Sequence, residues 1–365
     1  MKILFSLALF LSLSACSTIS YYSQSVQGQM SLLIKRESVD DLLLSAETPT
    51  DLKKSLHQAK NIREYASQQL FLPDNNSYHG YVDTKKPYIV WNVFAAPEFS
   101  LNPKNWCYPI VGCVSYRGYF SKEDAEKEAE DLRKQQLDVY VGGVSAYSTL
   151  GWFDDPLLNT MMHWKQRSLA SLIFHELSHQ VIYIENETSF NEAFSSAVER
   201  LGTIQWLLEF YPEELEAYIT YLNAQNDFRS LLLSTRQKLN KLYLSSQSTS
   251  QKRQKKQQII DGMKNEYLTI KQRWPNTIHF DRWFEKPINN ARLTSTMTYL
   301  QYIPAFFKIF IEEKGDWEKF YIRVIAFEKL SSTKRKVIIE NKSEYQINYS
   351  EISELIKSTI NLNQK

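Results

Sequence analysis

The pattern of apolar and polar positions predicts strands and helices in the first half of the chain and mainly helices after about residue 190. Apolar side chains recur at helical spacing in residues 50–70, which predicts an amphipathic helix. Residues 87–96 and 137–143 are rich in β-branched and aromatic side chains and predict two strands. Between these strands, Ser121 is followed by acidic residues and an amphipathic run, the pattern of a capped helix.

A further helix is predicted around HELSH, residues 175–179, because apolar side chains surround most of its circumference. With roughly 3.6 residues per turn, His175 and His179 share one face and could bind one metal ion. Glu176 projects about 100° away and could hold a water molecule without binding the metal itself. Burying these three polar groups is costly unless they are paired or metal-bound. A core helix whose histidines bond to backbone is the simpler alternative.

A catalytic zinc ion keeps three protein ligands and one open position, so a third ligand is needed. The best candidate is Glu192 in NEAF, residues 191–194, at the start of a second predicted helix that Thr188 or Ser189 could cap. The intervening residues are enough for a polar loop and a return alongside the first helix. Glu199, two turns later on the same face, is its rival as the third ligand, and we interpret it as a partner of the ligands or plain helix surface.

The N-terminus has the features of an export signal. Residues 3–13 are apolar and too short to span a bilayer as a helix, which needs ~20 residues. Leu13-Ser14-Ala15-Cys16 resembles a bacterial lipobox, which implies lipidation of Cys16, and Ser17 favours sorting to the outer membrane, facing the periplasm. An ordinary signal peptide with an incidental cysteine is the alternative. No later segment is apolar enough to span, so a lipid anchor is the expected membrane attachment.

Composition narrows the function classes. The 365 residues carry a net charge of +2, which gives no indication of nucleic-acid binding, and 13% aromatic residues argue against disorder. Export permits a disulfide between Cys107 and Cys113, although two buried thiols remain the alternative. The polar, basic run at residues 246–258 predicts a solvated helix face or a connection, with a membrane-surface patch as the other interpretation.

HELSHQ followed by NEAF resembles the gluzincin metallopeptidases, such as thermolysin-like enzymes and aminopeptidases. The resemblance implies Zn²⁺ held by His175, His179 and Glu192, with Glu176 as the general base. Thermolysin-like enzymes carry an aspartate four residues after the glutamate ligand to orient a histidine. Ser196 stands at that place here, so this role is vacant or filled by another residue.

A closer resemblance covers most of the mature chain. The segments WCYPIVGCVSYRGYF, VYVGGVSAYSTLGWFDDPLLNTM, HELSHQ, NEAF and NNARL together resemble a family of bacterial lipoproteins described as predicted aminopeptidases. The resemblance implies a peptide substrate, and it supports the peptidase class more firmly than aminopeptidase specificity.

The oxyanion formed during peptide hydrolysis needs a further donor. Tyr299 is our catalytic candidate, and Tyr302 is its close rival. Tyr147, Tyr116 and Arg117 are further candidates.

The stretch at residues 141–156 is the expected substrate wall because it directly precedes the zinc helix, and it could be an edge strand that binds the peptide backbone. We expect Tyr147, Ser148 and Gly151 to contact substrate. Asp154 and Asp155 either bind a substrate amine or, as we favour, stabilise a turn.

The sequence therefore predicts a zincin-like α+β protein, with a buried HExxH helix after a mixed first half and a mainly helical C-terminal half. Its expected parts are a signal peptide (1–15), a lipidated tether (16–36), a catalytic region (37–205) and a helical region packing on it (206–365). We expect the protein to be a zinc peptidase, and our preferred interpretation is an aminopeptidase that acts on small peptides in the periplasm. The alternatives are a zinc endopeptidase and a non-catalytic envelope lipoprotein that zinc stabilises.

Overall fold

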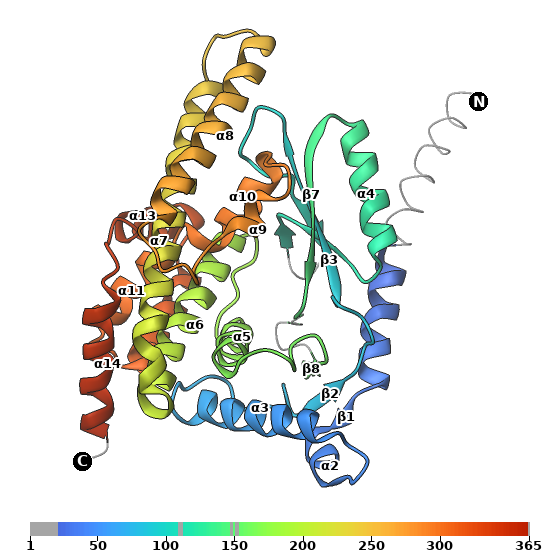
Figure 1. Cartoon of the computed structure of the whole chain (residues 1–365), viewed down its shortest axis with the longest axis vertical. Coiled ribbons are helices and arrows are strands. Elements are labelled where there is room, and N and C mark those ends of the chain that lie inside the picture. The colour runs from blue at the N-terminus through green and yellow to red at the C-terminus, as the bar shows by residue number, and fades with distance from the viewer. Residues whose placement is uncertain (1–20, 109–111, 147–148, 150–152, 364–365) are drawn as a thin grey trace.

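The computed structural model describes residues 21–108, 112–146, 149 and 153–363, and the statements below concern these residues. They form a mixed α+β structure in which short strands occupy the first half and helices follow from residue 166 onward (Figure 1). The predicted order of a mixed first half and a helical second half is therefore confirmed.

The largest sheet has three antiparallel strands in the order β6-β3-β7, formed by Arg117–Tyr119, Val90–Pro97 and Leu137–Val144. Helix α4 (Lys122–Lys134) covers one face of this sheet, and α10 (Asn290–Leu300) packs on the other (Figure 1). Because both faces are covered, β3 is buried along most of its length. β7 is an edge strand among the described residues.

Two smaller sheets complete the strands. β1 (Glu37–Ser38), β2 (Gly80–Val82) and β8 (Leu157–Leu158) form one sheet. β4 (Trp106–Tyr108) and β5 (Gly112–Val114) form the other, in which Cys107 and Cys113 are paired and joined by a disulfide. This disulfide ties together the two strands on either side of residues 109–111.

The helices of the first half match their sequence patterns closely. Helix α3 (Thr50–Gln68) buries one apolar face, as the spacing in residues 50–70 predicts. Helix α4 begins directly after Ser121, whose Oγ accepts a hydrogen bond from the backbone N–H of Asp124 at 3.2 Å. Acidic residues in its first turn and basic residues in its last turn complement the helix dipole.

Helix α6 (Thr188–Phe210) lies at the centre of the molecule and is buried over most of its length. The helices packed around it are α5 (Gln166–Ser178), α7 (Pro212–Tyr243), α10, α11 (Ile303–Glu312) and α14 (Tyr349–Asn363). The expected boundary at residue 205 falls within this helix. The regions 37–205 and 206–365 therefore share one hydrophobic core.

The basic run at residues 246–258 is largely helical, within α8 (Thr249–Lys271). Arg253 forms an ion pair with Glu98 at 2.6 Å, and Lys256 forms one with Asp138 at 2.7 Å. These pairs connect α8 to the large sheet, so part of the basic run has a structural role. The remaining elements are α2 (Val39–Leu44), α9 (Asp281–Phe284), α12 (Trp317–Ile325), η1 (Ala326–Lys329) and α13 (Ser332–Lys342).

Residues 21–34, which the sequence placed in the tether, form a helix that packs on the sheet region. The Arg117 guanidinium lies 4.0 Å from the centre of the Tyr21 ring, which also stacks on Tyr108. Gln24 Oε1 accepts a hydrogen bond from the backbone N–H of Phe120 at 3.1 Å. Cys16 and the expected signal peptide lie outside the described residues. Among the helices that the structure describes, none has the length and hydropathy to cross a membrane.

Candidate active site

The two histidines of HELSH lie at the C-terminal end of α5. His175 is in its last turn, and His179 is the residue that caps the helix. Their ring centres are 5.0 Å apart, so both rings lie on the same face, as helical spacing predicts. The side chains are only 13% and 8% exposed, respectively. Both rings therefore lie in surroundings where an unpaired polar group would be costly.

Glu192, in the first turns of α6, brings a carboxylate to both histidines. Its Oε2 lies 3.4 Å from Nε2 of His175 and 3.7 Å from Nε2 of His179. Ligands at about 2.1 Å from a tetrahedral zinc ion lie about 3.4 Å from one another. The potential ligand atoms of His175, His179 and Glu192 all lie within 4.8 Å of one another, and this group could hold a metal ion.

The other ring nitrogens have partners that orient the two histidines. Nδ1 of His175 lies 3.1 Å from Oε2 of Glu199, and Nδ1 of His179 lies 3.0 Å from Oγ of Ser195. An N–H at each Nδ1 leaves Nε2 as the atom that faces Glu192. The contacts that could serve the orienting role left open at Ser196 come from Glu199 for His175 and from Ser195 for His179.

The loop between α5 and α6 fixes where Glu192 lies. The Asn191 side chain accepts a hydrogen bond from the backbone N–H of Ile184 at 2.9 Å and donates one to its carbonyl at 2.8 Å. Contrary to expectation, α6 has Glu187 as its N-cap position, without a side-chain cap, and Thr188 is already its first helical residue. Arg335 instead holds Glu187 through an ion pair at 3.1 Å.

Burial and the neighbouring charges shift the pKa values of these groups in different directions. Burial alone would lower the pKa of His175, but hydrogen bonds to Glu192 and Glu199 outweigh it and raise that pKa well above its usual value. Burial lowers the pKa of His179 to about 4. Burial would raise the pKa of Glu192, yet the two histidines lower it. Glu192 is therefore ionised, which suits a metal ligand.

Glu176 has the properties expected of a general base. It is partly exposed and lines the same cavity as the three ligand candidates. Burial raises the pKa of its carboxyl to about 7. The nearby His175 lowers this pKa, whereas the negative charge of Glu192 raises it further. A carboxyl with a pKa near neutrality can both take up and release a proton during a reaction.

These residues line a cavity of about 1090 Å³. It is large enough for a short peptide. Helix α5, helix α6, helix α7, the end of β7 and the N-terminal helix at 21–34 contribute to it. Its aromatic lining residues are Tyr21, Tyr22, Tyr108, Tyr116, Trp164, Tyr183, Tyr218 and Tyr221.

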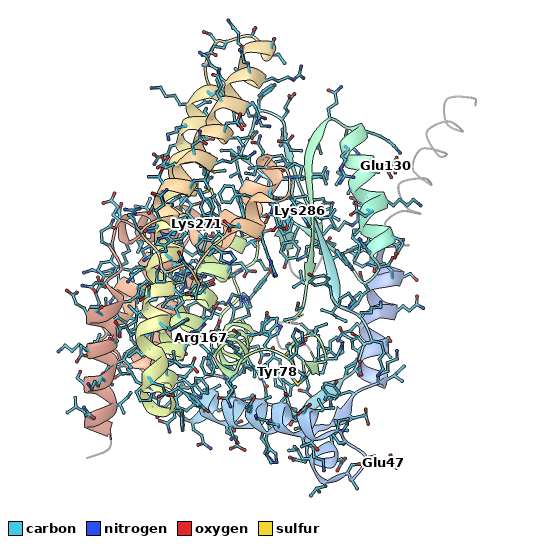
Figure 2. All side chains as sticks on the ribbon, viewed as in Figure 1. Glu47, Tyr78, Glu130, Arg167, Lys271 and Lys286 are labelled. Carbon is cyan, nitrogen blue, oxygen red and sulfur yellow. A yellow bond between two sulfur atoms is a disulfide. The ribbon has the colours of Figure 1, made fainter. Side chains whose placement is uncertain are left out.

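Most of this lining was not predicted from the sequence, and two parts of it are notable. Arg167, near the N-terminal end of α5 (Figure 2), lines the cavity and lies over the ring of Tyr218 at 5.2 Å. Tyr21 and Tyr22 come from a segment that was expected to be a tether. The adjacent tyrosines were the one signal in the sequence that this segment packs against the body of the protein.

The structure describes part of the expected substrate wall, residues 141–156. Tyr147, Ser148 and Gly151 lie outside the described residues. Residues 143–146, directly before them, line the cavity at the end of the edge strand β7. Asp155 accepts hydrogen bonds from the backbone N–H and the hydroxyl of Thr149 at 3.0 and 2.8 Å. These bonds agree with the turn that we favoured for this aspartate.

The candidate oxyanion donors have different locations. Tyr116 lines the cavity. Arg117 pairs with Glu128 at 3.5 Å and contacts Tyr21. Tyr302 lines a separate pocket. Tyr299 belongs to α10, and its side chain lies outside what the structure describes. Among the candidate oxyanion donors whose side chains the structure describes, Tyr116 is thus the tyrosine that lies at the cavity wall.

NNARL, which formed part of the family resemblance, has a structural role. Asn289 caps α10, and the Asn290 side-chain amide donates to the carbonyls of Pro97, Glu98 and Ser100 at 2.9–3.1 Å. Arg292 lies over the ring of Tyr140 at 5.3 Å. These contacts dock α10 on the large sheet.

Comparison with known proteins places the chain in a family. No curated protein and no solved structure matches it. Residues 20–339 match the model of the Aminopep family, described as "Putative aminopeptidase". This match spans the cavity, the three ligand candidates and most of the helical half. The chain therefore belongs to the Aminopep family.

Proposed function

We propose that the protein is a zinc-dependent peptidase that acts as an aminopeptidase on short peptides in the periplasm. One observation carries the proposal: His175, His179 and Glu192 converge at ligand distances beside Glu176, at the wall of one cavity. Family membership supports peptidase activity. Two imidazoles and one carboxylate are a donor set that suits zinc.

The roles of the side chains follow from their positions. When bound, zinc supplies a Lewis acid that polarises the peptide carbonyl and acidifies a water molecule. Glu176 takes the proton of the attacking water and delivers it to the leaving amine. Glu199 and Ser195 hold the two imidazole rings so that their Nε2 atoms face Glu192. Tyr116 is the described candidate for a hydrogen bond to the oxyanion.

Three features of the cavity suit a short peptide with a free amino terminus. The edge strand β7 ends at the cavity and can pair with an extended substrate backbone. Glu199 also lines the cavity, and its side chain is 31% exposed. Its carboxylate can accept a hydrogen bond from a substrate ammonium group as well as from His175. Arg167, which also lines the cavity and lies 4.0 Å from Glu214, supplies a positive charge for a carboxylate of a short peptide.

The proposed location is the periplasmic face of the outer membrane, with a lipid on Cys16 as the anchor. The lipobox-like segment supports this location. The disulfide between Cys107 and Cys113 is of the kind that persists in oxidising compartments outside the cytoplasm.

The test combines metal analysis with a Glu176→Gln variant. We expect the purified protein to contain about one zinc ion per chain by mass spectrometry of the metal. Glu176→Gln should keep the zinc ion and lose activity on alanine-containing peptides by a factor of about 10²–10⁴. Glu185→Gln, which changes an exposed glutamate in the following loop, is the matched control and should leave activity unchanged.

Each alternative gives a different result. A protein that binds no zinc contradicts the metallopeptidase assignment. Zinc binding without hydrolysis, with a melting temperature that falls on chelation, indicates a structural zinc site. Equal cleavage of a peptide and its N-acetylated form indicates an endopeptidase, because an aminopeptidase needs the free amine.

A further inference from the structure

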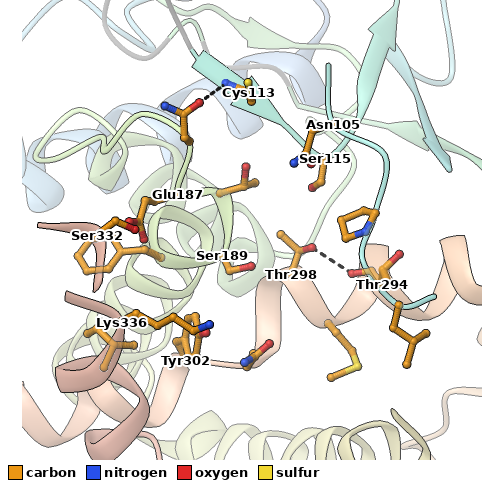
Figure 3. Close-up of a pocket in the computed structure, with 18 of the residues that line it drawn as sticks. Asn105, Cys113, Ser115, Glu187, Ser189, Thr294, Thr298, Tyr302, Ser332 and Lys336 are labelled. Carbon is orange, nitrogen blue, oxygen red and sulfur yellow. Dashed lines mark hydrogen bonds between the residues drawn. The ribbon is translucent and has the colours of Figure 1, made fainter. Parts of the chain in front are cut away.

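A second pocket lies next to the cavity that His175, His179 and Glu192 line, which we call the metal cavity. It lies between the end of β5, the start of α6, α10 and α13 (Figure 3). Its volume is about 240 Å³. One buried water molecule needs only about 10–15 Å³ of such space. Hydroxyl groups of Ser115, Ser189, Thr294 and Thr298 line it from three sides, and Figure 3 shows Ser115 facing Ser189 and Thr298 across the space.

The chain around β5 separates this pocket from the metal cavity. Cys113 and Ser115 line the second pocket, whereas Val114 and Tyr116 line the metal cavity. This alternation is expected for extended chain, in which successive side chains point to opposite faces. Among the described lining residues, Thr188 alone borders both spaces. The second pocket is therefore a separate compartment.

The side chains of the pocket carry an excess of positive charge. Glu187 is paired with Arg335 at 3.1 Å, and these two charges offset each other. Arg236 donates a hydrogen bond of 2.7 Å to Gln301, which is neutral. Lys336 is 63% exposed at the rim, 3.9 Å from Glu340, and such an exposed pair attracts weakly. Arg236 and Lys336 are thus available to balance a negative ligand.

The backbone adds to this positive character. Helix α6 is 23 residues long, and it begins at the pocket with Thr188 and Ser189. Among the described residues, no side chain caps its first turn, and the backbone N–H of Phe190 donates to the carbonyl of Glu187 at 2.9 Å. The first N–H groups of a helix have no intrahelical acceptor and carry a partial positive charge. At the start of α6, the N–H groups of Thr188 and Ser189 can donate to oxygens of an anion in the pocket.

The buried hydroxyl of Ser115 is a second, independent indication of a ligand in this pocket. Ser115 is 7% exposed and lines the pocket, and its Oγ has no hydrogen-bond partner in the described structure. A buried hydroxyl without a partner is unfavourable, so Ser115 needs a hydrogen-bond partner, which an oxygen of a bound ligand can supply. The uncapped helix start and Arg236 also donate, and all three lie around the same space.

We propose that this pocket binds a small oxyanion, a ligand that carries a phosphate or a carboxylate group. Arg236 and the start of α6 provide the charge, and Ser115 donates a hydrogen bond from the opposite wall. The ligand lies behind the partition formed by residues 113–116, out of contact with His175, His179 and Glu192. This site is independent of the proposed peptidase function.

Isothermal titration calorimetry of the mature, zinc-supplemented protein tests the site, with inorganic phosphate and acetate at constant ionic strength. We expect saturable binding of at least one of the two anions, and the comparison shows which one the pocket prefers. Arg236→Gln should weaken this binding by roughly tenfold, because it removes a charged donor. Ser115→Ala should weaken it severalfold. Lys334→Gln, an exposed lysine of α13 outside the pocket lining, is the control and should bind as the wild type does.

Lys336→Gln serves as a further variant at the rim, where folding is not at risk, and should weaken binding more than Lys334→Gln. The proposal is overturned if neither anion binds saturably. It is also overturned if folded Arg236→Gln and Ser115→Ala proteins bind as tightly as the wild type. That result would place the anion at the zinc site or on the surface.

Discussion

Nδ1 of His175 lies 3.1 Å from Oε2 of Glu199, so the imidazole is held from behind while its Nε2 faces Glu192. Glu199 follows Glu192 on α6 by about two helical turns, and this spacing brings both carboxylates to the same ring. Helix α6 thus supplies both the ligand candidate Glu192 and the carboxylate of Glu199, which contacts the ligand candidate His175.

This relationship predicts that Glu199→Ala weakens zinc binding about 10- to 100-fold, because the ring of His175 loses its orienting partner. Glu199→Gln, which keeps an oxygen acceptor, should recover part of the affinity. Competition with a chromogenic chelator measures the zinc affinity. Glu216→Ala, at an exposed glutamate of α7, is the control. Unchanged zinc affinity in Glu199→Ala would mean that Glu199 does not position His175.

The activity should depend on pH through Glu176. Burial raises the pKa of this carboxyl to about 7, so it is protonated, and unable to accept a proton, at lower pH. A bound cation favours the ionised form and lowers this pKa. We therefore expect kcat/KM of the zinc-loaded protein to fall with decreasing pH, with a midpoint at or below about 7. A profile that stays flat down to about pH 4, where an unperturbed glutamate titrates, would contradict this role.

Removal of the disulfide should destabilise the protein. Cys107 and Cys113 are six residues apart, and closing so short a loop is expected to stabilise the folded state by about 2 kcal/mol. The double variant Cys107→Ser/Cys113→Ser should lower the free energy of unfolding in urea by about this amount. A reductant should destabilise the wild type and leave the double variant unaffected. Equal stability of both proteins would show that β4 and β5 pair without the bond.

Asn290→Ala should also reduce stability. The Asn290 amide is fully buried and donates to the carbonyls of Pro97, Glu98 and Ser100, which lose this donor in the variant. We expect a loss of about 2–4 kcal/mol in the free energy of unfolding, measured by urea denaturation. Asn265→Ala, on the exposed surface of α8, should change it little. Similar stability of both variants would exclude a docking role for Asn290.

The sequence predicts local elements well where one pattern dominates. Helical spacing in residues 50–70 and β-branched residues at 87–96 predict α3 and β3, and the structure confirms both. The spacing of HELSH likewise places His175 and His179 on one side of α5, because a helix has a fixed period. Such features depend on neighbours in the sequence and need no knowledge of tertiary packing.

Other features depend on tertiary contacts and could not be predicted. The sequence offered Glu199 as either a partner of the ligands or plain surface, and only the packing of α6 against α5 brings it to His175. The sequence, with its 22 tyrosines, gave no means to choose which of them line the cavity. The alternation of Ser115 and Tyr116 between two compartments also requires knowing what packs on each side of the strand.

The helix at residues 21–34 has a practical consequence for anyone who shortens the protein. Tyr21, Tyr22 and Ser25 line the cavity although they lie only a few residues after Cys16. A shortened protein that begins at residue 37 would keep every residue of HELSH and NEAF. It would nevertheless lose one wall of the cavity, so an intact motif would not guarantee an intact binding surface.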